Sequence, residues 1–360
     1  MKAMILAGGM HRNMHPLFLR TPVGMEELFG KPVLEHTLAL LRAGGIREAG
    51  VILGEGAGQI MDHFGDGKAF GVALSYFVQE GRQGMAGAVR ACLSRMSDEE
   101  VLVLRGDLVW ETDLEQAVRF HRERGGQATL MLARGMGSLG DCLAVTDEAG
   151  KVLRLVSEPG QDQEVTDQVS SGVCILSPAA LALMPEQVGF DLERDLLVRL
   201  LAQGGTVYGC PVTGYWKRLD SCGDYLACAA DALGGKVKLE MGLPQQAPGI
   251  WSQRPVPDGV TVIPPCWLGP GAALEQGSVV GPYVMLGRET RVERGSIVQR
   301  SILLSKPGRR NTPPCTVRCW TAARRQSGER YSMRGWCWES GPWRSRGLSC
   351  WPGYGSGRDG

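Results

Sequence analysis

Short apolar runs alternate with longer amphipathic segments through the first two thirds of the chain. The runs have the length of strands, and the segments between them repeat apolar residues at helical spacing. Such alternation is typical of an α/β domain with a mostly parallel sheet covered on both faces. Ligands of these domains bind beyond the carboxyl ends of the strands, where Gly8-Gly9 and Gly106-Asp107 fall. We expect strands over residues 3–7, 48–53, 73–78, 101–104 and 128–133, and helices over residues 33–43, 58–64, 86–93 and 114–124.

A different period begins near Gly249. Apolar residues recur at every sixth position, and the series comprises Val256, Val262, Leu268, Leu274, Val280, Leu286, Val292 and Val298, with Leu304 as its last member. A six-residue repeat is typical of a parallel β-helix, in which each turn stacks on the next and buries one apolar column. We therefore expect an α/β domain over residues 1–235, a linker over residues 236–255 and a short β-helix over residues 256–304.

The remaining residues, 305–360, have another composition. From Gly308 onward they contain ten arginines, no lysine and five of the nine tryptophans of the chain, but only Val317 and Leu348 as aliphatic residues larger than alanine. So little aliphatic content cannot build a core, and no strand or helix period is present. We expect an irregular tail that is disordered or translated in a shifted reading frame. A basic, aromatic tail that binds nucleic acid is the alternative.

Composition narrows the class of protein. The apolar fraction is 43% and the charged fraction 21%, as in ordinary globular proteins. The net charge is +1, and because the tail is basic the rest of the chain is acidic, which argues against a nucleic-acid-binding body. No apolar run reaches the ~18 residues of a membrane span. The eleven cysteines are an odd number without a signal peptide, so we expect free thiols and a cytoplasmic protein.

The first expected strand runs directly into Gly8 and Gly9. Two glycines after a strand let the backbone turn tightly and direct its N–H groups towards a phosphate. Three further segments follow in register: Pro16-Leu17, Pro22 with Met25, and residues 30–36, which read G-K-P-V-L-E-H. With them, the opening resembles that of the sugar-1-phosphate nucleotidyltransferases. The resemblance is closest to bacterial mannose-1-phosphate guanylyltransferase-like chains, and it covers residues 1–304.

This resemblance implies a Rossmann-like nucleotidyltransferase domain followed by a short left-handed parallel β-helix. It implies transfer of GMP from GTP to mannose 1-phosphate, so that a nucleoside triphosphate and a sugar 1-phosphate are the partners and Mg²⁺ is the cofactor. Asp107 ends the strand-Gly-Asp motif that supplies a Mg²⁺ carboxylate in the family, and Mg²⁺ prefers such oxygen ligands. The nucleotide-binding positions of the family correspond to Leu6, Ala7, Gly8, Gly9, Gln79, Gly84 and Ala86.

Several charged positions of the family are substituted. His11-Arg12-Asn13 stands in place of the family's G-T-R, so Arg12 lies one position before the family arginine and is the candidate to replace it as a catalytic residue. Val23 occupies the position of the motif lysine. Loss of one donor that stabilises a transition state typically costs on the order of 10² to 10³ in rate.

The second metal carboxylate is displaced as well. Alignment without gaps puts Arg218 at the position of the family's aspartate, and Asp220 lies two residues later on the same side of an extended strand. Asp220 can then complete the metal pair with Asp107. Alternatively, the guanidinium of Arg218 pairs with Asp107 and stands in for the cation.

The expected sugar contacts fall in two segments. The family's E-K-P corresponds to Ser157-Glu158-Pro159, and its V-N-x-G corresponds to residues 169–172, which include Ser170 and Gly172. Ser170 keeps a hydroxyl that can donate a hydrogen bond to the sugar. Glu158, in contrast, brings a negative charge to the place where lysine faces the sugar phosphate in the family.

Three hypotheses for function remain open. The chain is an active nucleotidyltransferase, or an impaired paralogue that binds nucleotide or nucleotide sugar as a regulatory or assembly partner, or the product of a decaying gene. The number of substitutions favours reduced or absent activity on a retained fold. The resemblance further implies a homo-oligomer or association with a related nucleotidyltransferase, although an open β-helix edge can aggregate instead.

Overall fold

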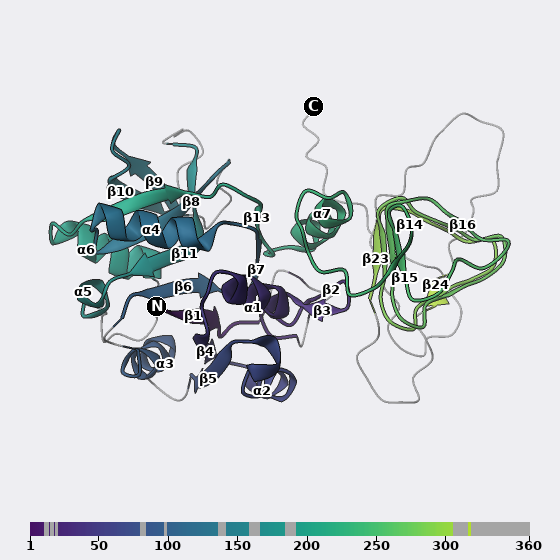
Figure 1. Cartoon of the computed structure of the whole chain (residues 1–360), viewed down its shortest axis with the longest axis horizontal. Coiled ribbons are helices and arrows are strands. Elements are labelled where there is room, and N and C mark those ends of the chain that lie inside the picture. The colour runs from purple at the N-terminus through teal and green to yellow at the C-terminus, as the bar shows by residue number, and fades with distance from the viewer. Residues whose placement is uncertain are drawn as a thin grey trace, which may run out of the picture. The chain divides into compact units, whose positions relative to one another are not determined.

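The computed structural model describes residues 1–10, 14, 18, 21–79, 84–96, 99–135, 142–157, 166–183, 192–304 and 316–317. The chain divides into two compact units (Figure 1). The first contains Met1–Cys228 and Lys236–Leu239, and the second contains Ala229–Gly235 and the residues from Glu240 onward. Among the helices so described, none is long and apolar enough to cross a membrane.

One nine-stranded sheet organises the first unit. Its strands are β1 (Lys2–Ala7), β4 (Glu48–Leu53), β5 (Ala73–Val78), β6 (Val101–Arg105), β8 (Ala128–Arg134), β9 (Cys142–Thr146), β10 (Val152–Ser157), β11 (Gln168–Leu176) and β12 (Val207–Pro211). The main path follows the order β10-β9-β11-β6-β1-β4-β5, and β8 pairs with both β11 and β12. β1 pairs in parallel with β4 on one side and with β6 on the other. The expected parallel core of the sheet is therefore confirmed.

The other half of the sheet is mixed in direction. β11 runs antiparallel to β6 and to β8, and β10 runs antiparallel to β9. The connection between β9 and β10 is a tight turn in which the Asp147 N–H donates to the Lys151 carbonyl over 2.9 Å and Gly150 has φ of 78°. Parallel strands need a crossover of a dozen or more residues, so a turn this short permits only antiparallel pairing.

The helices of the chain mostly match the expected ranges. They are α1 (Val33–Ala43), α2 (Ala57–Phe64), α3 (Gly84–Leu93), α4 (Leu114–Arg124), α5 (Pro178–Leu181), α6 (Val198–Ala202) and α7 (Cys222–Leu233), with a 3₁₀ turn η2 (Lys68–Phe70) and a π-helical turn η4 (Leu192–Leu197). The ends of α4 could be predicted from the sequence because capping residues mark both of them. Asp113 caps its start by accepting a hydrogen bond from the Gln116 N–H over 2.9 Å, and Gly125 ends it in the left-handed conformation.

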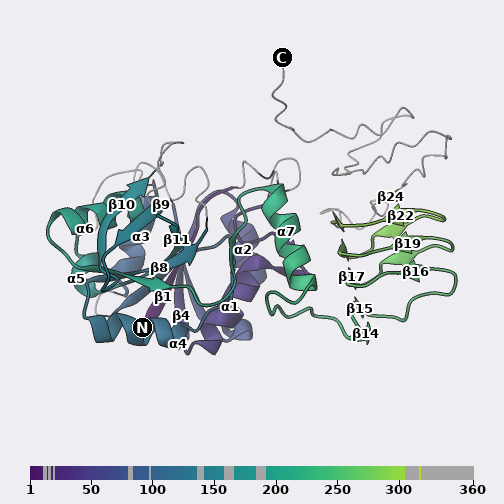
Figure 2. The same cartoon turned by 90° about the horizontal axis from the view of Figure 1, so that it is seen from above.

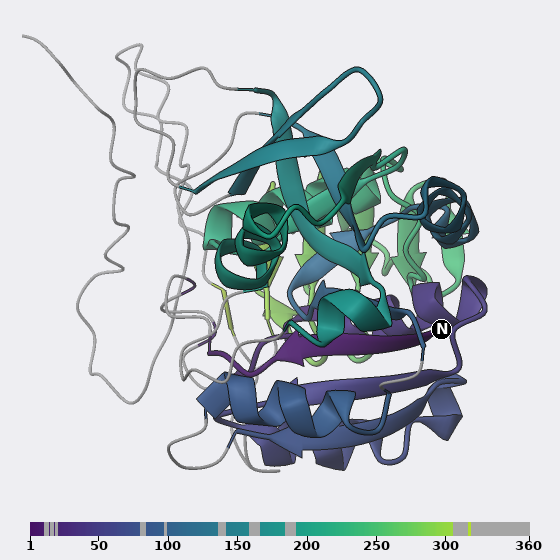
Figure 3. The same cartoon turned by 90° about the vertical axis from the view of Figure 1, so that its left-hand side faces the viewer.

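Two apolar layers cover the sheet, and helices lie on both of its sides (Figure 3). Successive side chains of a strand point to opposite faces. Ala3, Ile5 and Ala7 of β1 accordingly pack in one buried cluster with residues of α1, α2 and α4. Met4 packs in the other cluster, with residues of α3, α5, η4 and α6. Burial on both faces fixes the register of β1, because a slip by one residue would exchange the two faces.

Two short pairs of strands lie outside the large sheet. β2 (Glu27–Leu28) pairs with β3 (Lys31–Pro32), and β7 (Leu108–Trp110) pairs with β13 (Trp216–Arg218), both antiparallel. The second pair aligns Arg218 with Leu108, and the Leu219 N–H donates to the Asp107 carbonyl over 3.0 Å. Segments more than 100 residues apart in sequence are therefore held side by side at the end of β6.

The second unit consists of short strands in three sheets. The strands are β14 (Gln245–Ala247), β15 (Ile250–Ser252), β16 (Thr261–Val262), β17 (Cys266–Leu268), β18 (Ala273–Leu274), β19 (Val279–Val280), β20 (Val284–Leu286), β21 (Arg291–Val292), β22 (Ile297–Val298), β23 (Ser301–Leu303) and β24 (Thr316–Val317). Figure 2 shows them stacked in successive rungs. The sheets have the orders β14-β15-β17-β20-β23, β16-β19-β22 and β18-β21-β24, and all pairs except β14 with β15 are parallel.

The six-residue period corresponds to successive sheets of this unit, and residues 18 positions apart stack into a buried column. Leu268 pairs with Leu286, so β17 and β20 are offset by three six-residue repeats. Leu268, Leu286 and Val298 belong to the same apolar cluster as Ile250, which lies in β15 within the segment expected as a linker. Apart from β24, the segment after residue 304 lies outside the described residues.

The column generates a stability prediction. Leu286 is 0% exposed, and its replacement by alanine leaves a cavity that the stacked rungs cannot close, so we expect Leu286→Ala to lower the free energy of unfolding by about 2–5 kcal/mol. The matched control is Ile297→Ala, because Ile297 is 41% exposed and should lose less than about 1 kcal/mol. Chemical denaturation followed by tryptophan fluorescence measures both. Equal losses in the two variants would contradict the buried column.

A second prediction concerns His121 of α4. Its side chain is buried, and its Nδ1 lies 2.8 Å from the Thr129 Oγ1. Burial lowers the pKa of His121 below its usual 6.5; the charge of Glu100 opposes this shift and that of Arg122 adds to it. The unfolded chain then binds more protons than the folded chain once the pH falls below 6.5, so acidification should destabilise the fold.

The variant His121→Gln removes this linkage. We expect the wild-type free energy of unfolding to fall more steeply than that of the variant between about pH 7.5 and about pH 5.5. Urea titrations at several pH values provide the measurement. Parallel pH curves for the two proteins would show that His121 is not the group responsible.

Candidate functional site

The pairing of β1 with β6 brings two loops together at the carboxyl end of the parallel strands. Leu6 lies opposite Arg105, and the Gly106 N–H donates to the Leu6 carbonyl over 2.9 Å. Ala7 is fully buried at the end of β1, whereas Gly9 is exposed two residues later. The two-glycine turn and the Gly-Asp turn, expected from the sequence at strand ends, are therefore neighbours in space.

Gly8 has close neighbours on both Gln79 and Gly54. A Cβ atom on Gly8 would overlap the amide of Gln79, and a Cβ atom on Gly54 would overlap the Gly8 carbonyl oxygen. Gln79 is held in place by its N–H, which donates to the Leu53 carbonyl over 2.7 Å. Of the expected nucleotide-binding residues, the structure thus brings together Leu6, Ala7, Gly8, Gly9 and Gln79.

Next to Gly9 the loop carries an apolar side chain where the family has a cation. The Val23 N–H donates to the Gly9 carbonyl over 3.1 Å, and a Cβ atom built on Gly9 would lie 3.5 Å from the Val23 Cγ2. Met10 and Pro22 form a bridge that keeps this segment against the loop. Val23 therefore faces the turn but offers no charge to a phosphate.

Several expected site residues cannot be placed in this geometry. Arg12 and Glu158 lie outside the described residues. Gly84 and Ala86 belong to the first turn of α3, and Ser157 is the last residue of β10, but the side-chain surroundings of these positions also lie outside the described part of the chain.

Asp107 is the buried acid of the site. Its side chain is 3% exposed, and the guanidinium of Arg105 donates to both of its oxygens, from Nε to Oδ1 over 3.0 Å and from Nη2 to Oδ2 over 2.6 Å. Such a two-pronged pair is the strongest geometry between arginine and a carboxylate. Arg105 itself is 44% exposed, so it closes the site towards solvent.

Asp220 approaches the same guanidinium. The pairing of β13 with β7 brings it there, and its Oδ1 is 3.9 Å from the Arg105 Nη2. The Arg218 Nε donates to Asp220 Oδ2. The contacts of the described residues thus join Arg105 with Asp107 and Arg218 with Asp220, whereas the sequence offered a pairing of Arg218 with Asp107 as one alternative.

Arg105 and Glu193 were not expected as site residues. Arg105 is the last residue of β6, and Asp107 follows two positions later in the turn, so their closeness in sequence was the available signal. Glu193 comes from η4, and nothing near it in sequence indicates a site. Its carboxylate accepts a hydrogen bond from the Ser170 hydroxyl, and the Gly172 N–H donates to the Ser170 Oγ over 3.3 Å.

Burial and charge act in opposite directions on Arg105. Burial by itself lowers the pKa of Arg105, but the charge of Asp107 and its hydrogen bonds raise it more, and Asp220 and Glu193 raise it further. The net direction is upward, so the guanidinium stays charged. Gly172 leaves room for the arginine, because at φ of 76° its missing Cβ would lie 2.7 Å from the Arg105 Cδ.

The donor set does not fit Mg²⁺ as it stands. Both oxygens of Asp107 accept hydrogen bonds from Arg105, and one oxygen of Asp220 accepts from Arg218. Within the described ranges, no three His, Cys, Asp or Glu side chains gather closely enough to hold a metal ion. A divalent cation would have to displace a guanidinium from the carboxylate that it already neutralises.

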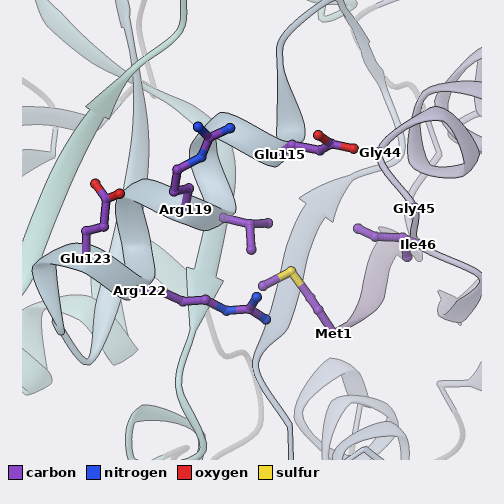
Figure 4. Close-up of a pocket in the computed structure, with 9 residues that line it drawn as sticks. Met1, Gly44, Gly45, Ile46, Glu115, Arg119, Arg122 and Glu123 are labelled. Atoms are coloured by element: carbon purple, nitrogen blue, oxygen red, sulfur yellow. The ribbon is translucent and has the colours of Figure 1, made fainter.

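A pocket of about 450 Å³ lies at the other edge of the sheet, near Met1, where β1 begins (Figure 4). It is lined by Gly44, Gly45 and Ile46 before β4 and by charged residues of α4, including Arg122. The Arg122 Nη2 is 2.8 Å from the Glu100 Oε2, so its charge is compensated. The pocket belongs to the amino ends of the strands and is separate from the Arg105–Asp107 cluster.

Comparison with known proteins gives the same family from sequence and the same fold from structure. Residues 2–233 match the family described as nucleotidyl transferase. A UTP–glucose-1-phosphate uridylyltransferase of Synechocystis sp. is 28% identical over 78% of this chain and 81% of its own length. A mannose-1-phosphate guanylyltransferase of Mycobacterium tuberculosis is 29% identical over 78% of this chain and 76% of its own length.

Among solved structures, a Bacillus anthracis protein assigned as a glucose-1-phosphate thymidylyltransferase, crystallised with sucrose, matches with a TM-score of 0.57 and 20% identity. The match covers 66% of this chain and 97% of that protein, and it supports the fold. The family match spans well over half of the chain, including the loop at Gly8 and the pair of Asp107 and Asp220. The chain therefore belongs to the nucleotidyl transferase family, among the sugar-1-phosphate nucleotidyltransferases.

Proposed function

We propose that this chain binds GTP and mannose 1-phosphate at the carboxyl end of the parallel strands and transfers GMP slowly. In this reaction a phosphate oxygen of mannose 1-phosphate attacks the α-phosphorus of GTP. The new oxygen–phosphorus bond forms as the bond from the α-phosphorus to the bridging oxygen breaks. GDP-mannose and pyrophosphate are the products, and family membership supports the coarser activity of nucleotidyl transfer to a sugar 1-phosphate.

The observation that carries this proposal is the close packing around Gly8. Gly54 lies so close to the Gly8 carbonyl that no side chain fits at Gly54, and a side chain at Gly8 would displace the amide of Gln79. The exposed backbone at Gly9 follows directly, and backbone N–H groups in such a turn can bind phosphate without any lysine or arginine. This part of the phosphate site depends on glycine and main-chain atoms, which the chain retains.

The choice of guanine and mannose rests on resemblance. The guanylyltransferase of Mycobacterium tuberculosis supports it, whereas other relatives are named for UTP or for thymidylyl transfer. Gln79 is the described side chain beside the loop that can hydrogen-bond a base or ribose. We therefore propose GTP as the first nucleotide to test and UTP and dTTP as its competitors.

Low activity follows from the charges of the site. Val23 supplies no cation beside Gly9, and Arg105 is engaged with Asp107. Loss of one transition-state donor typically costs on the order of 10² to 10³ in rate. An impaired paralogue that binds nucleotide and acts through a related nucleotidyltransferase is the second candidate, and the Arg105–Asp107 pair is the observation that favours it.

The proposal also covers the fold of the second unit, the oligomeric state and the location in the cell. The stacked parallel strands, the six-residue repeat and the buried column support a left-handed β-helix of hexapeptide repeats. The resemblance implies that such a β-helix supports oligomers. We therefore propose a homo-oligomer or association with a related nucleotidyltransferase. A cytoplasmic location fits free cysteines, of which the described residues contain seven.

Turnover is the direct test of the proposed function. Purified protein is incubated with mannose 1-phosphate and, separately, with GTP, UTP, dTTP or ATP, and released pyrophosphate is measured. We expect release with GTP at a rate at least about 100-fold below that of the Mycobacterium tuberculosis enzyme, because the lysine position is Val23. Absence of both turnover and GTP or GDP-mannose binding would rule out the proposal, while binding without turnover favours the paralogue.

The glycine packing gives a second, matched test. In Gly54→Ala the new Cβ overlaps the Gly8 carbonyl and must shift the turn, so we expect GTP affinity to fall by about tenfold or more. Gly58→Ala is the control, because no atom lies within 4 Å of a Cβ there and alanine favours the helix α2. Isothermal titration with GTP compares the two variants. Unchanged affinity in Gly54→Ala would place the phosphate elsewhere.

A further inference from the structure

Arg105 contacts the carboxylates of Asp107 and Asp220. Its guanidinium donates to both oxygens of Asp107 and lies 3.9 Å from Asp220. Glu193 adds a third carboxylate whose charge acts on the same group. The positive charge that compensates Asp107 and approaches Asp220 is therefore part of the chain.

We propose that Arg105 is a built-in replacement for the divalent cation, so that this site excludes metal ions and binds its phosphate ligand without them. The first half of the proposal concerns only the protein and the metal. The second half rests on the proposed function, because it names the ligand of the same site.

Electrostatic repulsion explains why the Arg105 guanidinium and a divalent metal ion exclude each other. The shortest contact, 2.6 Å from Arg105 to Asp107, leaves no room for a metal ion on the same oxygen in that direction. A divalent ion bound between Asp107 and Asp220 would also lie within a few ångströms of the guanidinium. Repulsion between like charges is strong in a partly buried site, where screening by water is weak.

The position of Arg105 is supported along the whole side chain. Gly172 has no Cβ, which leaves a gap for the arginine Cδ and Cγ, and its φ of 76° disfavours other residues. The charged end faces Asp107, whose side chain is 3% exposed and needs a compensating cation in the fold. An arginine serves this purpose without any ion from solution, since its guanidinium stays protonated.

Ligand binding changes accordingly. Without a cation, Asp107, Asp220 and Glu193 would repel a phosphate at this end of the sheet. With Arg105 in place, and with Arg218 beside Asp220, two guanidinium groups compensate three carboxylates among the described residues. A phosphate held by the main chain of the Gly8 turn can therefore approach in the absence of Mg²⁺.

Removal of Arg105 should create a metal site. The test uses the full-length protein, from which metal is removed by EDTA and dialysis. The protein is titrated with Mn²⁺, and the electron paramagnetic resonance signal measures the free ion. The variant is Arg105→Gln, which takes away the positive charge. Arg105→Lys keeps a charge at the same position, and Arg122→Gln removes an arginine from an exposed ion pair with Glu100.

We expect wild type, Arg105→Lys and Arg122→Gln to leave the Mn²⁺ signal free. Arg105→Gln should bind one Mn²⁺ per chain at least about tenfold more tightly than wild type, which corresponds to about 1.4 kcal/mol. Adding Asp107→Asn to Arg105→Gln should abolish that binding. Circular dichroism of each variant verifies that it is folded.

Two results would overturn the metal half of the proposal. One is stoichiometric Mn²⁺ binding by wild type that Asp107→Asn removes, and the other is a folded Arg105→Gln that binds no Mn²⁺. If Arg105→Gln does not fold, the wild-type titration decides: a free signal supports the proposal, and Asp107-dependent binding defeats it.

Titration of wild type with GTP in EDTA and in Mg²⁺ addresses the ligand half. Equal affinity in the two buffers supports metal-independent binding, and binding that requires Mg²⁺ contradicts it. No GTP binding in either buffer counts against the proposed function and against the ligand half. The Mn²⁺ titrations contain no nucleotide, so their outcome remains separate.

Discussion

The parallel hydrogen bonding of β1 to β4 and β6 is the constraint on which the candidate site depends. Because β1 lies between these two strands, the turns after all three strands meet at one edge of the sheet. The Gly8 turn comes from β1, Gly54 follows β4, and Gly106 with Asp107 follows β6. Apolar packing on both faces of β1 holds its register, so the same interactions that stabilise the core also position the polar site.

On this frame the proposed phosphate-binding site has a main-chain half and a charged half. The main-chain half, built from glycines, leaves no room for a side chain at Gly54, where a Cβ would overlap the Gly8 carbonyl. The charged half has the apolar Val23 beside the turn and Arg105 against the buried Asp107. The main-chain half depends on the packing of the turn, and the charged half depends on which side chains follow the strands.

The second unit follows a simpler rule. Residues spaced by six fall in successive sheets of the unit, and parallel pairing at an offset of 18 residues stacks every third one into a column. Each rung therefore needs its neighbours to bury its own apolar residue, and Ile250 shows that the stack starts before the part of the sequence with the clearest period. Stability in such a unit is shared between adjacent rungs.

Hydrophobic periodicity alone predicted the parallel core of the sheet, the ends of α1 and α4, and the six-residue repeat of the second unit. Each of these depends on contacts between residues that are close in sequence or at a fixed spacing. The Gly-Gly and Gly-Asp turns could also be predicted, because glycine allows the tight turns that follow these strands. Tertiary structure decided the rest. The antiparallel pairing of β11, the approach of Glu193, and the choice of Arg105 over Arg218 as the partner of Asp107 depend on segments far apart in sequence. Charges act through distance in space, so only the folded chain selects which arginine meets which carboxylate.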